Sequence, residues 1–432
     1  MSTAPLSSSP EEPSVIVGGR EQLFHLLAEA AEVEHALMCT YLYAAFSLKQ
    51  GNSEDLSADE AAAVARWRKV IMSVAIEEMV HLLLVANLSI AVGSRPHFGR
   101  PNFPVATGHF PSGLILKLAP FCEETLDHFI FVERPRGVVL EDGSGFHHEA
   151  EYVREEAYHG LMPSLQEYAT VGHLYDALLT NLDASAHRLG EKALFVGPVE
   201  AQMGRKAVDL DRVMTVSNLD EARTAVGLIL EQGEGSLDDR ANSHYQRFLS
   251  VRTELRQLCS ANPRFSPAWP TVHNPVMRRP PEPENKVFVN HSESARVLDL
   301  ANAIYGLLLR LLVQAFGQTG VDSARQQRQH VSAAIELMQL LGRTASALAQ
   351  RPASADTPGE NAGVTFTMLR SVEPLFRGPI ETRLVIERLR ELAVGARDAI
   401  AICPELAGMD RTLDTLATRF GESIAEKRGS AG

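Results

Sequence analysis

Apolar residues recur every three or four positions along most of this 432-residue chain, which is the spacing of one face of an α-helix. Two long helices are predicted first, over residues 21–49 and 58–92. The second begins at Ser57-Ala58-Asp59-Glu60, a Ser-x-x-Glu capping box that satisfies the first backbone N–H groups. The same periodicity predicts helices over residues 162–189, 219–232, 243–256, 294–316, 324–348 and 379–403, then a last amphipathic helix reaching residue 424.

Two segments interrupt the helical pattern. Residues 93–145 hold many prolines and glycines with short apolar pieces between them, and about fifty residues is too long for a plain connection. We interpret this segment as a lid or the wall of a pocket. Residues 261–290 are rich in proline and predict an extended, semi-rigid connection. The expected organisation is a disordered tail (1–18), a bundle (19–260) with the lid (93–145), the connection (261–290), and a C-terminal helical region (291–425) packed on the bundle.

Composition narrows the class of protein. With 45% hydrophobic and 22% charged residues the chain is globular, and little strand signal appears, so the fold class is all-α. The net charge of −13 argues against nucleic acid or an anionic membrane as partner. No run reaches the roughly 18 to 20 uncharged apolar residues of a membrane span, and the N-terminus lacks the features of a signal peptide. Four widely spaced cysteines are expected to be reduced. These features predict a cytoplasmic protein.

Glu78 and His81 carry the most informative chemistry. They lie three residues apart on the apolar face of the second predicted helix, so both side chains are expected to point inward. Burying a glutamate costs several kcal/mol unless it is compensated, and a metal ion would compensate it, as in four-helix carboxylate bundles. The motif is common, however, and Glu78 could instead pair with a basic residue while His81 is an ordinary core histidine. Glu34 lies in the apolar stripe of the preceding helix, which favours the first half of a dimetal site.

The second half of such a site has four candidates downstream. Glu231 ends a predicted helix, where an acid opposes the helix dipole, and Glu234 follows at same-face spacing. Both could be simple helix-end charges beside glycine turns, but metal coordination would explain them. His244 follows on the next helix, and His173 lies at the margin of the stripe of the helix predicted over residues 162–189.

Several short words along the chain, taken together, resemble one known family. In order they are Glu34-His35-Ala36, Thr40-Tyr41-Leu42-Tyr43-Ala44, Glu78-Met79-Val80-His81, Pro111-Ser112-Gly113-Leu114, Leu118-Ala119-Pro120-Phe121, Val132-Glu133-Arg134-Pro135, Tyr168-Ala169-Thr170-Val171-Gly172, Phe195-Val196-Gly197, Glu231-Gln232-Gly233-Glu234-Gly235 and Ser243-His244-Tyr245. The series resembles bacterial ferritin-like proteins related to the violacein-pathway iminophenyl-pyruvate dimer synthase, over about residues 20 to 275.

The resemblance implies a ferritin-like four-helix core with a metal site, in proteins often encoded with secondary-metabolite pathways. It implies Glu34, Glu78, His81 and Glu231 as ligands. Where the family often has an acid, this chain has His173, and a nitrogen ligand there would lower the negative charge of the site. That weakens the case for two bridged iron ions and leaves room for one metal, or for copper or zinc.

The leading functional hypothesis is therefore an oxidative enzyme with one or two iron ions, held by Glu34, Glu78, His81, His173 and Glu231, with His244 as a further candidate. Its expected partner is a small aromatic or amino-acid-derived substrate. Tyr41, Tyr168 and Tyr175 could donate hydrogen bonds to the ligands or could simply be core residues. Metal binding without turnover, or a structural protein with buried ion pairs, would fit the same residues. The sequence leaves the oligomeric state open, a homo-oligomer included.

Overall fold

The computed structural model describes residues 13–51, 55–147, 151–154, 161–233, 242–320, 322–370 and 372–429. Over these residues the chain is mostly helical with almost no strand, which confirms the all-α prediction. The helices are α1 (Arg20–Ser47), α2 (Ala58–Ala91), α3 (Glu123–Val132), α4 (Val171–Leu189), α5 (Glu191–Leu194), α6 (Leu219–Gly233), α7 (His244–Ala261), α8 (Ser292–Ala315), α9 (Ser323–Leu348), α10 (Pro379–Ile402) and α11 (Met409–Gly429), with short 3₁₀ turns η1 (Val199–Ala201) and η3 (Pro404–Leu406). The strands β1 (Pro275–Val276) and β2 (Val287–Phe288) form one parallel pair.

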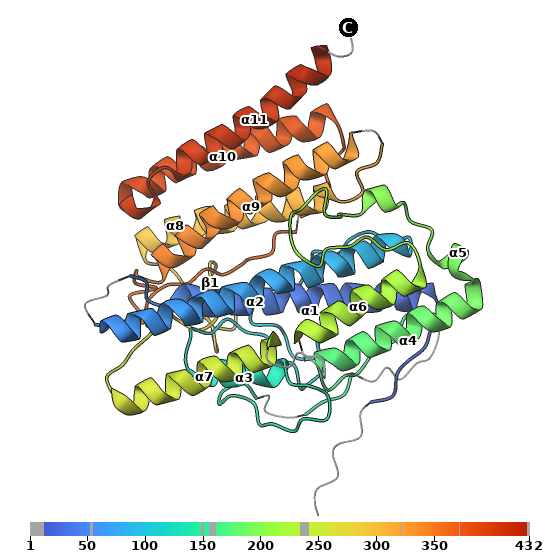
Figure 1. Ribbon diagram of the computed structural model, residues 1–432. Helices are drawn as coiled ribbons and strands as arrows, with labels where there is room; N and C mark the ends of the chain where they lie inside the picture. The colour runs from blue at the N-terminus through green and yellow to red at the C-terminus, as the bar shows by residue number, and fades with distance from the viewer. Residues whose placement is uncertain are drawn as a thin grey trace, which may run out of the picture.

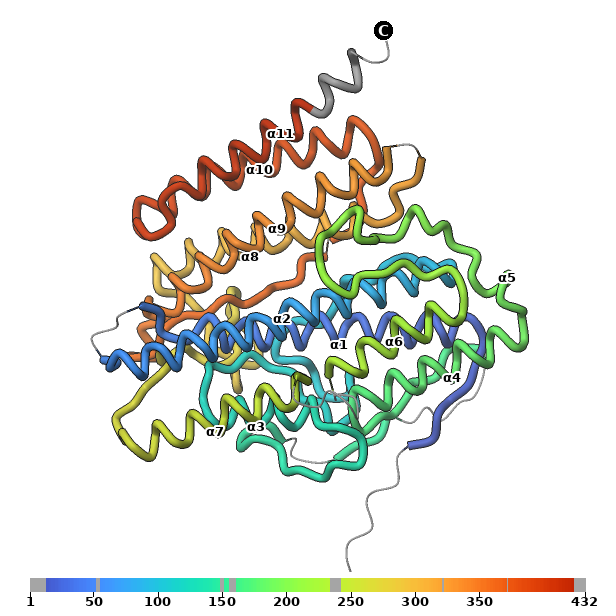
Figure 2. Tube along the Cα trace, in the orientation of Figure 1, coloured from blue at the N-terminus to red at the C-terminus, as the bar shows by residue number. Residues whose placement is uncertain are grey.

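The helices are arranged in layers around the pair α1 and α2 (Figure 1). One face of this pair is covered by α4 and α6 toward one end and by α3 and α7 toward the other. The opposite face is covered by α8 and α9, beyond which α10 and α11 form the outermost layer (Figure 2). The third and fourth helices of the bundle are thus each divided into two pieces, which places several helix ends at the middle of α1 and α2.

The long helices begin and end close to the predicted positions. Ser57 caps α2 as expected: its side chain accepts a hydrogen bond from the backbone N–H of Glu60, and the Glu60 side chain accepts one from the N–H of Ser57. The helix predicted over residues 162–189 begins only at Val171, because Thr170 caps it through the backbone N–H of His173, 3.2 Å away. Helix α3 was not predicted at all.

The segment interpreted as a lid is part of the core. Its side chains Phe103, Phe110 and Leu118 are buried, and helix α3 lies inside it. The buried side chains of α3 pack against α7. The interpretation of residues 93–145 as a lid or the wall of a pocket stays a prediction. A segment of this kind escapes periodicity analysis because a ten-residue helix offers few repeats to recognise.

The proline-rich connection runs along the end of α1 as extended chain. The N–H of Trp269 donates to Ser47 O at 2.8 Å, and the N–H of Lys49 donates to Pro267 O at 2.9 Å. The Tyr43 hydroxyl donates to Val272 O at 2.5 Å. These contacts fix the connection to the bundle.

Two helices, Ala58–Ala91 and Ser292–Ala315, are long and apolar enough by composition alone to cross a membrane. In this fold 67% and 78% of their apolar windows are buried against other parts of the chain, which is the environment of core helices. Burial on several sides also explains their composition, because a helix covered by layers on both faces needs no continuous polar stripe.

Gly197 packs against the last turn of α2, where its N–H donates to Ala91 O at 3.1 Å. A Cβ atom at this position would lie 1.7 Å from the carbonyl oxygen of Ile90, so the Gly197→Ala variant must displace backbone. We expect it to lower the free energy of unfolding by about 1–3 kcal/mol, as overpacking does, in chemical denaturation. The matched control is Gly227→Ala in α6, where a Cβ meets nothing within 4 Å and alanine is the better helix former. Equal effects of the two substitutions would contradict this packing.

Candidate metal centre

Three of the predicted ligands meet between α1 and α2. Glu34 comes from α1, and Glu78 and His81 come from one face of α2, as their spacing required. The Nδ1 atom of His81 lies 2.8 Å from Glu78 Oε2 and 3.3 Å from Glu34 Oε2. All three side chains are buried, and one ligand atom of each lies within 4.8 Å of the others. This is a distance set that a single cation can span.

A second group of the same kind shares Glu78. It consists of Glu78, Glu133 and His244, whose ligand atoms also lie within 4.8 Å of one another. The Nδ1 atom of His244 lies 3.0 Å from Glu78 Oε1 and 3.5 Å from Glu133 Oε2. The two oxygens of Glu78 therefore face one histidine each, and the two rings stack with centroids 5.5 Å apart. A carboxylate placed this way can bridge two adjacent cations.

The outer nitrogens of both histidines are held by acceptors. The Nε2 atom of His81 lies 3.0 Å from Gln232 Oε1, and that of His244 lies 3.1 Å from Glu77 Oε2. Because an amide oxygen and a carboxylate accept hydrogen bonds, each Nε2 carries a proton, so each Nδ1 is the atom that faces the acids and can bind either a cation or, in the apoprotein, a second proton. Fixing the tautomer and ring orientation from outside is what metal-ligating histidines require.

Two tyrosines hold the outer oxygens of the acids. Tyr175 on α4 donates its hydroxyl hydrogen to Glu34 Oε1, and Tyr41 on α1 donates to Glu133 Oε1. Tyr168, the third tyrosine considered, donates to Glu29 Oε1 at 3.1 Å and so lies outside both groups. The sequence allowed Tyr41 and Tyr175 to be either hydrogen-bond donors to the acids or ordinary core residues. In the structure both are buried and both donate a hydrogen bond to an acid of the cluster.

The electrostatics of the cluster show strong mutual coupling. Burial, reinforced by the Glu78 charge, raises the pKa of Glu34 to about 8. Burial also acts to raise the pKa of Glu78, but the nearby His81 and His244 hold it well below the usual range. Burial opposes protonation of His81, yet the Glu78 and Glu34 carboxylates raise the pKa of that imidazole to about 10. The apoprotein therefore holds protons among these side chains to offset the buried negative charge.

The donor set fits a hard or borderline cation. Within the part of the chain that the structure describes, no lysine or arginine forms an ion pair with Glu34, Glu78 or Glu133, so three buried carboxylates converge without a fixed cation. Carboxylate oxygens together with imidazole nitrogens suit iron, manganese and zinc. Beside the ligands lies a cavity of about 20 Å³, bordered by Gly172 and Gly233, which is room for a single water-sized molecule.

The structure does not bring Glu231 to this cluster. Its carboxylate is 40% exposed and lies 3.6 Å from the guanidinium of Arg212. The next residue, Gln232, points inward and contacts His81 instead. One position along a helix rotates the side chain by about 100°, so Glu231 and Gln232 point in different directions, and an argument from an acid at a helix end does not say which of the two faces inward. Glu234 lies outside the described residues.

The two histidines proposed from the sequence have different surroundings. His244, at the first position of α7, belongs to the second group described above. His173 is buried in the first turn of α4, but neither group of acids and histidines includes its side chain. Its role as a ligand stays a prediction.

Glu133 is the residue that sequence reasoning did not single out. It follows α3 directly, as the C-cap residue, and its side chain is buried. The word Val132-Glu133-Arg134-Pro135 contributed to the family resemblance, so a signal was present. An acid at a helix C-terminus opposes the helix dipole, but this argument could not select Glu133 because helix α3 was not predicted.

The helical bundle with its paired acid–histidine groups defines the class of protein. The pattern of the ferritin-like family matches residues 27–253, a span of more than half the chain that includes Glu34, Glu78, His81, Glu133 and His244. The chain therefore belongs to the ferritin-like family, as the sequence words indicated.

Its relatives include two enzymes with named products or substrates. The dichlorochromopyrrolate synthase of Lentzea aerocolonigenes is 26% identical over 440 residues, covering 94% of this chain and 41% of the relative. The 2-imino-3-(indol-3-yl)propanoate dimerase of Chromobacterium violaceum is 25% identical over 422 residues, covering 93% of this chain and 38% of the relative. The chain thus spans about two fifths of the length of these relatives. A ferritin-like protein from Caulobacter vibrioides superimposes with a TM-score of 0.46 at 20% identity, covering 76% of this chain and 97% of that one.

Removing the hydroxyl of Tyr175 tests its supporting role. In Tyr175→Phe the Glu34 carboxylate loses its donor, and we expect metal affinity to fall about 10–100-fold, as for other partners of ligating side chains. Competition with a chelator of known affinity measures the change. Tyr43→Phe is the matched control, because that buried hydroxyl donates its hydrogen bond to the backbone oxygen of Val272 and not to a member of either group. Equal losses in both variants would indicate a general packing defect instead.

Proposed function

We propose that this protein is a metal-dependent oxidative enzyme that acts on a small amino-acid-derived or aromatic substrate. Iron is the expected metal, with Glu34, Glu78 and His81 holding one ion and Glu78, Glu133 and His244 holding a second. The observation that carries the proposal is the shared carboxylate Glu78, whose two oxygens face the two histidines at 2.8 and 3.0 Å. A bound redox-active ion would supply electron transfer to dioxygen, which the side chains of a protein cannot provide.

The proposed ligand set is asymmetric. Ferritin-like dimetal proteins use a glutamate from each of two helices and a Glu-x-x-His pair from each of the other two. Here the first pair is Glu78 and His81, but three positions before His244 the chain has Ala241. The second half of the centre therefore has one carboxylate fewer. An incomplete ligand set supports catalysis rather than storage, because reaction at a metal needs open coordination positions.

The surrounding residues would control protons and water. The Tyr41 and Tyr175 hydroxyls, whose pKa values are raised well above the usual range by burial and by the neighbouring carboxylates, stay protonated and act as fixed donors. Val132, Ile229 and Leu230 form apolar walls of the small cavity. A space of about 20 Å³ beside the ligands admits a molecule the size of dioxygen.

The relatives suggest the substrate class. One is named for dimerising an imine of an indole-bearing amino acid. Joining two such molecules by a new bond releases two electrons and two protons, and dioxygen can take these up as hydrogen peroxide. We therefore propose an oxidised amino-acid imine, or a related aromatic acid, as the substrate of the present chain or of the larger protein to which it corresponds.

The proposal is tested with iron-loaded protein and 2-imino-3-(indol-3-yl)propanoate, generated in place from tryptophan by an amino-acid oxidase. We expect dioxygen consumption beyond that of the oxidase and a coupled product in mass spectrometry, both abolished in Glu78→Gln. Stoichiometric metal with no dioxygen consumption, for this substrate and a panel of amino-acid imines, would support the alternative of a non-catalytic metal-binding protein.

A further inference from the structure

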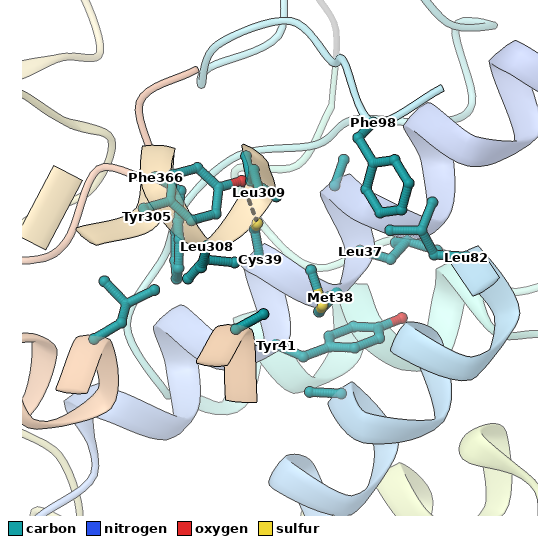
Figure 3. Close-up of a cluster of buried hydrophobic side chains, with 14 of the residues drawn as sticks. Leu37, Met38, Cys39, Tyr41, Leu82, Phe98, Tyr305, Leu308, Leu309 and Phe366 are labelled. Atoms are coloured by element: carbon teal, nitrogen blue, oxygen red, sulfur yellow. Dashed lines mark hydrogen bonds between the residues drawn. The ribbon is translucent and has the colours of Figure 1, made fainter. Parts of the chain in front are cut away.

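A large apolar cavity lies on the other side of α1 and α2 from the acid–histidine cluster. Its volume is about 720 Å³, and its walls come from α1, α2, α8 and α9. Figure 3 shows some of the lining side chains: Met38 and Cys39 of α1 lie toward Tyr305, Leu308 and Leu309 of α8, and Leu82 of α2 lies near Phe98. The cavity opens to solvent on one side, and its volume is within the range of about 300–1,000 Å³ found for small-molecule sites.

The cavity is separate from the proposed metal centre. Along α1, Glu34, Leu37 and Tyr41 face the cluster, whereas Met38, Cys39 and Leu42 line the cavity. A ligand here would therefore be divided from the cluster by the helices themselves. It would be bound without contact to Glu34, Glu78 or His81.

The lining is unusually adaptable. Five of the eleven methionines in the chain border the cavity, namely Met38, Met72, Met79, Met203 and Met338. Methionine is flexible and polarisable, so surfaces rich in it accept apolar ligands of varying shape. At the mouth, Ile76 and Ile335 from facing helices are both 40% exposed, which leaves apolar side chains beside an entrance.

The shape of the cavity favours an elongated ligand. Its lining along α2 extends from Arg68 to Leu83, and at 1.5 Å per residue this is about 22 Å. A compact aromatic acid would fill only part of that length, while an extended acyl chain would follow it. The apolar residues dominate this wall, so the body of the ligand must be apolar as well.

Arg68 supplies the polar end. Its side chain is half-buried in the cavity wall, its Nε atom has no hydrogen-bond partner, and within the described residues no acid pairs with it. The only acid among the lining residues, Glu405, pairs with Arg351 at 3.0 Å. The second arginine of the lining, Arg343, donates to the backbone oxygens of Glu405 and Ala407. A partly desolvated guanidinium without a counter-ion is stabilised by binding an anion. We infer that this cavity binds a long-chain apolar carboxylic acid, with its chain between α1/α2 and α8/α9 and its carboxylate at Arg68.

The test is a fluorescence titration with cis-parinaric acid, a conjugated eighteen-carbon fatty acid whose emission rises in apolar surroundings. We expect saturable binding of one molecule per chain, displaced by stearic acid. In Met338→Trp the larger side chain enters the cavity, and binding should fall more than about tenfold. The control is Leu384→Trp on α10, which lies outside the cavity and should bind as the parent does.

A second pair of variants tests the carboxylate contact. Arg68→Gln should weaken binding of the acid about tenfold while leaving displacement by stearyl alcohol unchanged. Lys69→Gln removes the same charge from the adjacent position, which does not line the cavity, and should have no effect.

Binding that is unaffected by Met338→Trp in a folded protein would overturn the proposed site. If Arg68→Gln weakens binding of the acid and of stearyl alcohol equally, the proposed contact between the ligand carboxylate and Arg68 is wrong. Because neither readout depends on bound metal or on turnover, these outcomes are independent of the proposed oxidative function.

Discussion

Glu78→Gln is expected to abolish metal binding in both halves of the centre at once. Glu78 is the one side chain common to the two groups, and glutamine offers a single neutral oxygen where two charged ones stood. The loss of affinity should exceed the about 10–100-fold effect of outer hydrogen-bond partners, so metal content measured by mass spectrometry of the native protein should fall close to zero. Glutamine has nearly the same volume, so the fold should be retained, as circular dichroism would verify.

Glu231→Gln is the matched control for this substitution. It makes the same chemical change at an acid that is half-exposed and pairs with Arg212, outside both groups. We expect parental metal content. Loss of metal in Glu231→Gln, or full occupancy in Glu78→Gln, would contradict the ligand set proposed from this geometry.

Removal of the metal is expected to lower the melting temperature. A cation that binds only the folded chain stabilises it by about 2.7 kcal/mol when its free concentration is a hundred times its dissociation constant. For a chain of 432 residues that corresponds to a fall of about 3 °C on chelation, measured by differential scanning calorimetry.

The control for chelation is the Glu78→Gln protein itself. It should melt at one temperature with and without chelator, because it has no metal to lose. A parent protein that melts at the same temperature with chelator, without it and with added iron would contradict metal binding. That result would mean that protons and histidines alone compensate the negative charge of Glu34, Glu78 and Glu133.

The sequence was sufficient to predict the long helices, in which apolar residues recur at regular spacing. Helices α1 and α2 each carry many turns of apolar residues, and Ser57 and Glu60 mark a start signal, so their boundaries were predicted within two residues. The inward placement of Glu34, Glu78 and His81 followed from the same periodicity. Local rules succeed here because a long helix averages over many positions.

The rest of the site depended on contacts between distant segments. Glu133 and His244 sit at the ends of short or interrupted helices, where few turns define an inward face. Gln232, and not Glu231, contacts His81, because Glu231 was selected as an acid at a helix end, which does not define the face of α6 that points inward. Which helix ends meet around Glu78 is decided by tertiary packing, and a single sequence carries no direct record of it.

Two helices of the bundle are divided into shorter pieces. The ligands in the two halves of the proposed centre therefore differ in how rigidly the backbone fixes them. Glu34, Glu78 and His81 lie well inside long continuous helices, whereas Glu133 caps the end of α3 and His244 begins α7. Helix ends open locally at far lower free energy than helix interiors do. An ion held by Glu133 and His244 would therefore exchange with solution faster than an ion held by Glu34 and His81. The first ion could be lost and replaced while the second stays bound.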